Sequence, residues 1–190
     1  MTVGSTSTTL VNRALQEIAA RATVTGTNPT FDGSAAGNAA GILYTPAVEM
    51  LLREQDWEFS RITATLVTSG VPVLYPWTYS YLYPSDCMKI RSVVPVTWIL
   101  NDPQPVRWSE QSWPVGGLNV RTILCNVPAA VLVYSTNNVT EVQFDPLFEE
   151  ALVRFLASEL AMALGGRPDY SRVKLEESGS LVQSGAGRDS

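Results

Sequence analysis

The chain has 190 residues, of which 45 % are hydrophobic and only 16 % charged, and its formal net charge is −5 at pH 7; this length suits one domain with a sizeable core. The acidic balance argues against a protein whose main task is to grip nucleic-acid phosphates, because such binding needs a basic patch. The sequence contains no histidine, which excludes Ser-His and Cys-His nucleophiles, histidine-ligated zinc and the commonest general base.

Two helices are predicted in the first third of the chain. Residues 8–21 place apolar side chains on one helical face and polar ones on the other, and a similar pattern extends over residues 34–55. Ser34 can cap the second helix, whereas Pro46 removes one of its hydrogen bonds, so we expect a single kinked helix. Residues 23–34, between the two helices, are rich in turn formers, which predicts a loop.

Residues 57–142 change to the pattern of β-strands. Short runs of β-branched and aromatic residues are bounded there by Gly, Pro, Asn and Asp. Five strands are expected, at residues 61–67, 75–84, 87–100, 120–126 and 129–135. The stretch 101–117 has no clear pattern, and Asn126-Val127-Pro128 indicates a hairpin turn between the last two strands. We expect an antiparallel meander.

A central helix is predicted over residues 146–165, and the rest of the chain is organised around it. Asp145 suits its N-cap. At about 100° per residue its apolar side chains span an arc of roughly 200°, which leaves a narrow polar stripe of Glu150, Arg154 and Ser158. One neighbour cannot cover so wide an arc. The helix is therefore expected to be the central member of a bundle, or to be shared with another subunit.

A weaker helix is predicted over residues 168–178, where apolar residues are sparse. The composition of residues 179–190 predicts a flexible tail. The N- and C-terminal helices most economically form one helical bundle, with the antiparallel β region of residues 57–142 inserted between them in the sequence. The expected fold class is α+β, in a single domain of residues 1–190.

Surplus apolar surface marks candidate contacts with other subunits or partners, because the charged fraction is well below the average of about 25 %. Glu159 lies near the middle of the apolar arc, where a buried acid could serve an active site. With no histidine or second carboxylate placed beside it, pairing with an arginine of a neighbouring helix or subunit is favoured. The candidate interface residues are Phe148, Leu152, Phe155, Glu159, Tyr79, Tyr81, Leu181 and Val182.

No catalytic, cofactor-binding or metal-binding residues are predicted. Cys87 and Cys125 lack metal-ligand spacing and are expected to be buried, reduced thiols; neither glycine motif of nucleotide binding occurs. Asp56 and Glu58 flank Trp57 in the manner of a sugar platform with two acids, but a helix-to-strand corner with a buried Trp57 is favoured. We therefore expect no enzymatic activity.

A row of aromatic residues suggests a nucleic-acid surface. Tyr79, Tyr81 and Tyr83 share one face of an extended strand, and with Trp77 they could stack bases. Single-strand binders interleave such aromatics with Lys and Arg, whereas residues 71–87 contain no basic residue. Packing in the core or at a subunit interface is therefore favoured.

Targeting and membrane signals are not expected. The first residues show no basic region followed by an apolar run, so no secretory signal is predicted. No run approaches the ~18 apolar residues of a membrane span. Asn138-Val139-Thr140 matches the glycosylation pattern, which has no meaning in a chain that is not secreted.

Four segments, taken together and in order, are distinctive. They are LVNRALQEIAA at residues 10–20, the helix from Tyr44-Thr45-Pro46-Ala47 to Leu51-Leu52-Arg53 running into Asp56-Trp57-Glu58-Phe59, Tyr79-Ser80-Tyr81-Leu82-Tyr83-Pro84-Ser85-Asp86-Cys87, and Phe144-Asp145-Pro146-Leu147-Phe148. In this combination the chain resembles the tail tubular protein A-like adaptors of tailed bacteriophages. The resemblance covers residues 9–178 and is not close at residues 23–34 and 101–117.

The resemblance implies a structural adaptor of the phage neck. Such an adaptor forms a ring, usually of twelve copies, that joins the portal protein to the tail tube or nozzle protein. DNA passes through its channel without specific binding, and an acidic lining would repel phosphates. The family implies a place in the virion, after assembly in the host cytoplasm, and no catalysis. We also expect the tail from Ser178 to contact the portal or an adjacent adaptor.

Other functions remain open. A siphophage head-completion protein or tail terminator would be a related role, with a long tube rather than a short nozzle as native partner. A carbohydrate-binding or glycan-cleaving virion protein would use Trp57 and the group Trp98, Trp108 and Trp113. Single-strand nucleic-acid binding would give a salt-sensitive gel shift, which we expect to be absent.

Overall fold

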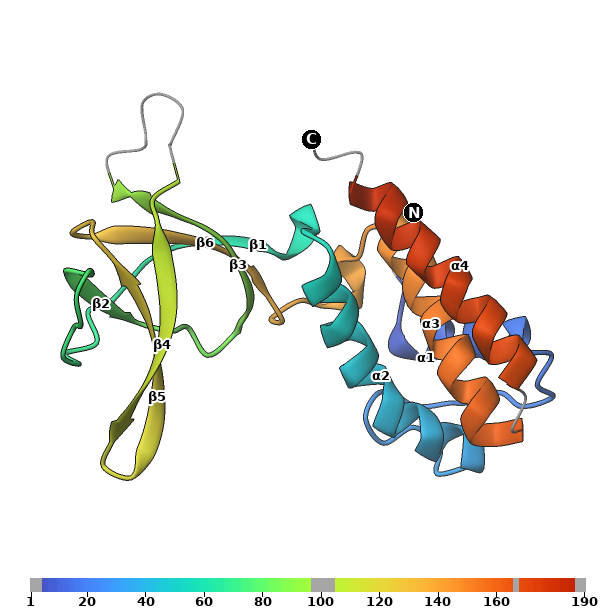
Figure 1. Cartoon of the computed structure of the whole chain (residues 1–190). Coiled ribbons are helices and arrows are strands. Elements are labelled where there is room, and N and C mark those ends of the chain that lie inside the picture. The colour runs from blue at the N-terminus through green and yellow to red at the C-terminus, as the bar shows by residue number, and fades with distance from the viewer. Residues whose placement is uncertain (1–4, 97–104, 166–167, 187–190) are drawn as a thin grey trace. The chain divides into compact units, whose positions relative to one another are not determined.

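The computed structural model describes residues 5–96, 105–165 and 168–186. Where the sequence predicts one domain, the chain divides into two compact units (Figure 1). Unit 1 comprises Met1–Phe59 and Val139–Ser190, and unit 2 comprises Ser60–Asn138. The described residues form four α-helices and two three-stranded antiparallel sheets, which confirms a mixed α+β fold.

Unit 1 is helical. Its helices are α1 (Ser7–Glu17), α2 (Ala35–Glu54), α3 (Pro146–Gly165) and α4 (Pro168–Ala186). Short 3₁₀ turns occur at η1 (Glu58–Ser60) and η3 (Glu141–Gln143). The other three helices all contact α3, and α4 lies alongside it (Figure 1).

Helix α1 is shorter than predicted at its C-terminal end. The Thr6 side chain accepts a hydrogen bond from the Thr9 N–H, and the Thr9 side chain bonds back to the Thr6 N–H, so a capping box starts the helix at Ser7. The chain leaves the helix at Ala19, whose φ of 52° lies in the left-handed region. The Ala19 and Ala20 N–H groups then close the last turn, which ends the helix at Glu17 rather than near residue 21.

The predicted positions of α2 and α3 are confirmed. Ser34 caps α2, since its Oγ accepts from the Gly37 N–H at 3.0 Å, and the helix continues through Pro46. Asp145 Oδ1 accepts from the Leu147 N–H at 2.8 Å at the start of α3. Local capping chemistry therefore sets where both helices begin.

Helix α4 extends well past the predicted end at residue 178. The prediction of a flexible tail is wrong for residues 179–186, which are helical; residues 187–190 lie outside the described part. The Ser178 hydroxyl donates to the Ala151 carbonyl oxygen at 3.0 Å, and Leu181 and Val182 pack against the core of unit 1. Tertiary contacts with α3 thus order a segment whose own composition is too polar to predict it.

The predicted loop at 23–34 is confirmed and packs tightly on the first half of α2. A Cβ added at Gly41 would lie less than 3.0 Å from the Pro29 carbonyl oxygen, and one added at Gly37 would approach the Asp32 carboxylate as closely. Real Cβ atoms do not come so near. The obstacle at Gly41 is backbone, so the loop can lie on this helix only because that position is glycine, whereas at Gly37 the Asp32 side chain would have to move.

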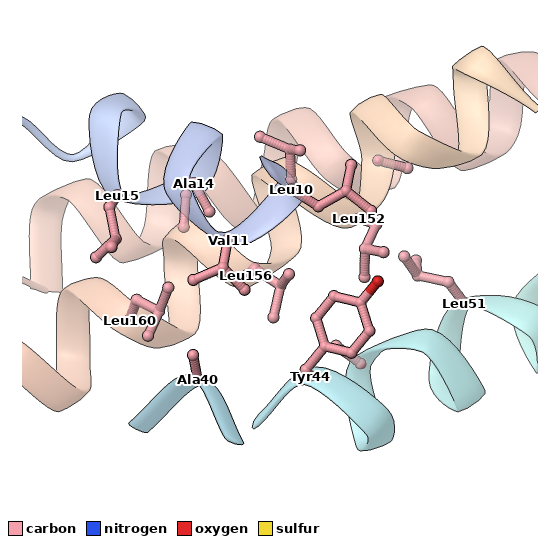
Figure 2. Close-up of a cluster of buried hydrophobic side chains, with 14 of the residues drawn as sticks. Leu10, Val11, Ala14, Leu15, Ala40, Tyr44, Leu51, Leu152, Leu156 and Leu160 are labelled. Carbon is pink, nitrogen blue, oxygen red and sulfur yellow. The ribbon is translucent and has the colours of Figure 1, made fainter. Parts of the chain in front are cut away.

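The core of unit 1 is built from three helices, as Figure 2 shows. Side chains from α1, α2 and α3 point toward one another there and are almost completely buried. The labelled residues are Leu10, Val11, Ala14, Leu15, Ala40, Tyr44, Leu51, Leu152, Leu156 and Leu160. Small residues such as Ala14 and Ala40 let the helices approach closely.

Unit 2 consists of two antiparallel sheets. One sheet has the order β1-β6-β3 and the other β2-β5-β4. Their strands are β1 (Arg61–Thr65), β2 (Tyr79–Leu82), β3 (Cys87–Pro95), β4 (Trp108–Val115), β5 (Leu118–Cys125) and β6 (Ala130–Thr136). The core of the unit draws side chains from both sheets, including Tyr81, Ile123 and Leu132.

One strand of the β region was not predicted, and two expectations are wrong. Strand β4 falls largely in the stretch 101–117, which has no clear pattern in the sequence. The strand orders are not those of a meander. The turn at 126–128 does not close a hairpin, because β5 and β6 belong to different sheets, and Ala129 adopts a positive φ of 50° between them.

Candidate interaction surfaces

The apolar arc of α3 is covered by the chain's own helices. Phe148 and Leu152 have no exposed surface at all, so the prediction that they contact a partner is wrong. Phe148 packs edge-on against Trp57 at 5.2 Å between ring centroids and against Phe144 at 4.7 Å. From Phe148 to Ala161 the arc therefore stabilises unit 1 itself, whereas Met162 and Leu164 near the end of α3 are 51 % and 36 % exposed.

The polar stripe of α3 lies beneath neighbouring helices and takes part in ion pairs. Arg13 of α1 reaches Glu150 at 2.7 Å, and Glu150 also pairs with Arg154 at 2.8 Å. Arg154 in turn pairs with Glu177 of α4. Ser158, the third member of the predicted stripe, is 1 % exposed.

A second group of ion pairs, centred on Lys174, connects α4 to α1. Lys174 Nζ lies 2.6 Å from Glu17 Oε2 and 3.1 Å from Glu177 Oε2. The hydrogen bond that Lys174 donates to Glu17 is the main cause that raises the pKa of Lys174, against an opposing effect of burial. Burial raises the pKa of Glu177, but the bonds from Lys174 and Arg154 outweigh it and lower that pKa overall. These ion pairs add to the packing of Leu181 and Val182 in holding α4 in place.

The remaining predicted interface residues of unit 1 are half-buried. Phe155, Leu181 and Val182 pack against the unit's core. Glu159 is also half-buried. Their contact with a partner stays a prediction, and they offer at most part of their surface for it.

The tyrosine row belongs to the core of unit 2. Tyr81 is 1 % exposed and donates its hydroxyl to the Val127 carbonyl oxygen at 2.7 Å. Tyr79 stacks on it at 6.3 Å, and Tyr83 also packs on this core. Of the two favoured interpretations, packing in the core therefore holds for Tyr81, and its assignment as an interface residue is wrong.

Two arginines lie over aromatic rings that the sequence leaves without a basic neighbour. Arg107 lies 5.6 Å from the centroid of Trp77, and Arg121 lies 3.9 Å from that of Tyr83. Arg121 also pairs with Glu110 at 2.7 Å. These contacts join segments far apart in the chain, so no local pattern could have predicted them.

Asp86, part of one of the distinctive segments, serves as a structural anchor. Its carboxylate accepts from the Tyr134 hydroxyl at 3.2 Å and from Thr136 Oγ1 at 2.8 Å. Burial, followed by the nearby Asp86 charge, raises the pKa of Tyr134 to about 12. These bonds tie the turn before β3 to β6.

The alternative sites weighed from sequence find little support in the geometry. Trp57 is buried and its indole N–H donates to the Leu51 carbonyl oxygen at 2.9 Å, so its ring cannot serve as a sugar platform. Trp108 packs against the core of unit 2, and Trp98 lies outside the described residues. Cys87 and Cys125 are free and buried, as predicted, and burial raises the pKa of both thiols.

Neither a metal site nor a membrane helix is found in the described part of the chain. No group of three or more Cys, Asp or Glu side chains there is placed to hold a metal ion. No helix there combines the length and apolar character that a membrane crossing needs.

Apolar side chains remain exposed on both units. In unit 1 they lie on α2, α3, α4 and η3: Ile42, Met50, Val142, Met162, Leu164, Val173 and Leu175. In unit 2 they lie along the sheets and the chain near β2: Ile62, Val67, Leu74, Tyr75, Leu82, Val96, Val115 and Leu118. None of these residues is among the interface residues predicted from the sequence.

The tip of the β4–β5 hairpin is the most distinct of these surfaces. Val115 and Leu118 stand opposite each other across Gly116 and Gly117, whose φ values of 57° and 84° suit a type I′ turn. A Gly-Gly pair between alternating residues is a hairpin signal, and it could have revealed β4 from sequence.

Comparison with known proteins does not name a family. No family model matches the chain, and no curated protein matches it.

Proposed function

We propose that this chain is a structural adaptor of the phage neck, which forms a ring that joins the portal protein to the tail tube or nozzle. The observation that carries the proposal is the resemblance of four ordered segments to tail tubular protein A-like adaptors. Under this proposal the four helices form a bundle made from the two ends of the chain, with the β region inserted. The ring, of about twelve copies by analogy with the family, stands in the virion and has no enzymatic activity.

The positions of the four segments support the resemblance. Two of them, ending in Phe59 and Phe148, meet in one aromatic cluster. The centroid of the Phe59 ring lies 5.0 Å from that of Phe148 and 5.6 Å from that of Phe144. A third contains Tyr81 and Asp86, which anchor the core and a turn of unit 2. The matching residues thus carry the packing of each unit, where a shared fold constrains residue type most strongly.

The surface chemistry supports assembly, although not through the buried residues Phe148 and Leu152 of α3. The chain is poor in charge, and exposed apolar side chains occur on both units. Scattered apolar residues are normal on a surface, but an opposed apolar pair at a hairpin tip is a typical contact element. A net charge of −5 also suits a channel wall that DNA passes without sticking.

The mass of the purified protein, measured alone and then with the portal protein of its phage, tests the proposal. We expect a ring of many copies to form, alone or on the portal. A protein that stays monomeric at all concentrations and ignores the portal would overturn it. Capture of a long tail tube instead of a nozzle would assign the related head-completion or tail-terminator role.

A further inference from the structure

Strands β4 and β5 continue as a two-stranded ribbon beyond the end of β2. Strand β2 pairs with β5 only over residues 122–125, whereas β4 pairs with β5 as far as Val115 and Leu118. Residues 112–121 therefore form a hairpin of two strands, which we call the ribbon. A two-stranded hairpin is marginally stable in water unless another surface packs on it.

One face of the ribbon is apolar. Alternate residues of a strand share a face, and the register sets Trp113 opposite Val120 and Val115 opposite Leu118. Val115 is 48 % exposed and Leu118 is 74 % exposed. The opposite face carries Ser112, Pro114, Asn119 and Arg121. The ribbon is thus amphipathic, and its apolar side is most open at the tip.

A hollow of about 420 Å³ lies at the base of the ribbon. It is lined by Asn119, Val120 and Arg121 of β5 and by Leu82, Tyr83, Pro84, Ser85 and Cys87. The only charged group of the lining, Arg121, is paired with Glu110 and lies over the Tyr83 ring. Pockets of about 300–1,000 Å³ hold small ligands, so the hollow has room for the two aliphatic side chains of a ribbon tip.

We propose that the ribbon tip of one copy, with Val115 and Leu118, docks into this hollow on a neighbouring copy. The contact deepens the proposed ring and rests on its self-association. The tip residues 113–120 contain no Asp, Glu, Lys or Arg, and the one charged side chain in the described lining of the hollow, Arg121, is already paired with Glu110 at 2.7 Å. An uncharged, aliphatic tip therefore meets no unpaired charge in the hollow, which suits it better than a phosphate backbone, whose binding needs free cations.

A second copy is the natural occupant because every copy carries both halves of the contact. The tip residues Val115 and Leu118 are not part of the lining of the hollow, so the contact is head-to-tail and repeats from copy to copy, which closes a ring when the rotation allows. Burial of uncharged, apolar groups also predicts an association that persists at high salt, whereas contacts between exposed charges would weaken.

The first test compares Leu118→Asp with Ile42→Asp, because Leu118 and Ile42 are both 74 % exposed and Ile42 lies on α2. Mass is measured by light scattering over a range of concentrations, alone and with the portal protein, after thermal unfolding has shown that both variants are folded. We expect Leu118→Asp to weaken self-association by about 100-fold and Ile42→Asp to leave it unchanged.

The outcomes separate this inference from the proposed function. Rings that form equally well with Leu118→Asp would overturn the ribbon contact and leave the adaptor proposal standing. Rings that form but no longer bind the portal would assign the tip to the portal, and would overturn self-docking. A wild-type protein that is monomeric both alone and with portal would overturn both.

The second test locates the partner surface directly. Leu118→Cys protein is mixed with Leu82→Cys protein and treated with oxidised glutathione, so that a 118–82 disulfide can form only between two chains. We expect this crosslinked dimer in the mixture, and none from the wild type, whose two cysteines are buried. Dimers joined 118–118, or no crosslink, would overturn docking of the tip in the hollow.

Discussion

Helix α3 and the β4–β5 ribbon both carry an apolar face, and the structure treats them in opposite ways. The arc of α3 is covered by α1, α2 and α4, and Leu152 in it has no exposed surface. The ribbon extends past the third strand of its sheet, and Leu118 at its tip is 74 % exposed. An apolar residue is therefore a candidate for an interface only where no other helix or strand of the same chain covers it.

The two regions also differ in how charge is used. Helix α4 combines apolar packing of Leu181 and Val182 with ion pairs, in which Glu177 meets Arg154 of α3 and Lys174 meets Glu17 of α1. The ribbon has one charged residue, Arg121 at its base, and none from residue 112 to residue 120. The stability with which α4 packs on unit 1 should therefore depend on pH. The stability of the ribbon tip should not, because only apolar contacts are available to it.

The largest expected difference in stability is between two variants that each truncate one leucine, Leu152 in α3 and Leu118 in the ribbon. Leu152→Ala should lower the free energy of unfolding of unit 1 by about 2–5 kcal/mol, because it leaves a cavity among three helices. Leu118→Ala in dilute, monomeric protein should change stability by less than about 0.5 kcal/mol. Urea denaturation followed by circular dichroism measures both. Comparable losses from the two variants would break the comparison.

A smaller loss of stability is expected when alanine replaces Gly41, which is needed for close packing, or Gly116, which is needed for its positive φ. Gly41→Ala should destabilise unit 1 by about 1–3 kcal/mol, because the new Cβ meets the Pro29 carbonyl oxygen and the backbone must shift. Gly116→Ala meets no atom within 4 Å but requires a positive φ, so it should cost about 1 kcal/mol. Gly116→Asn should recover most of that loss, since Asn tolerates this conformation. Thermal unfolding measures all three.

The matched control for Gly41 is Gly179→Ala in α4, where an added Cβ has no neighbour within 4 Å. It should stabilise the protein by about 0.5–1 kcal/mol through helix propensity. A stabilising Gly41→Ala would show that the loop does not rest on α2 as described.

The pH dependence of α4 should be smaller still. The folded pKa of Glu177 is lowered, so its contribution is present above the unfolded pKa of about 4.3 and is lost as pH falls through the folded value. Because these carboxylates are partly exposed, we expect the loss to be about 0.2–1 kcal/mol. Hydrogen exchange of the α4 amides, corrected for intrinsic rates, should therefore speed up below pH 4.

Two controls sharpen this measurement. Glu177→Gln should show faster exchange of α4 already at pH 7 and a weaker pH dependence. Amides of residues 111–120 should show no such dependence, because that stretch contains no ionisable side chain. A ribbon that loosens together with α4 on acidification would contradict the proposed separation of the two regions.

The smallest effect is a gain of stability from removing a strained alanine in each unit. Ala19 and Ala129 have φ values of 52° and 50°, which glycine adopts without steric cost. Ala19→Gly and Ala129→Gly should each raise the free energy of unfolding by about 0.5 kcal/mol, measured as a higher midpoint in urea. A loss of stability from both would show that these turns are not held in the left-handed region.

Much of the fold was predictable because its signals are local. Ser34 and Asp145 cap α2 and α3 where the sequence places them, since a cap depends on residues only two or three positions away. The antiparallel strands and the buried thiols were also predicted. The Gly116-Gly117 turn was a local signal as well, and using it would have revealed β4.

The candidate surfaces were far less predictable. Phe148, Leu152 and Tyr81 were expected at interfaces because apolar character alone does not reveal how many neighbours a residue has. Residues 179–186 were expected to be flexible because their helix is ordered by α3, not by its own composition.

The amino-acid sequence by itself determined the helix starts, the main strands and the shortage of charge, since these depend on composition and on residues close together in the chain. Only the tertiary structure decided which apolar faces are covered and which remain open. That decision rests on partners such as Arg13 with Glu150 and Glu17 with Lys174, which are separated by most of the chain. Covering a surface requires distant segments to meet, and no local pattern contains that information.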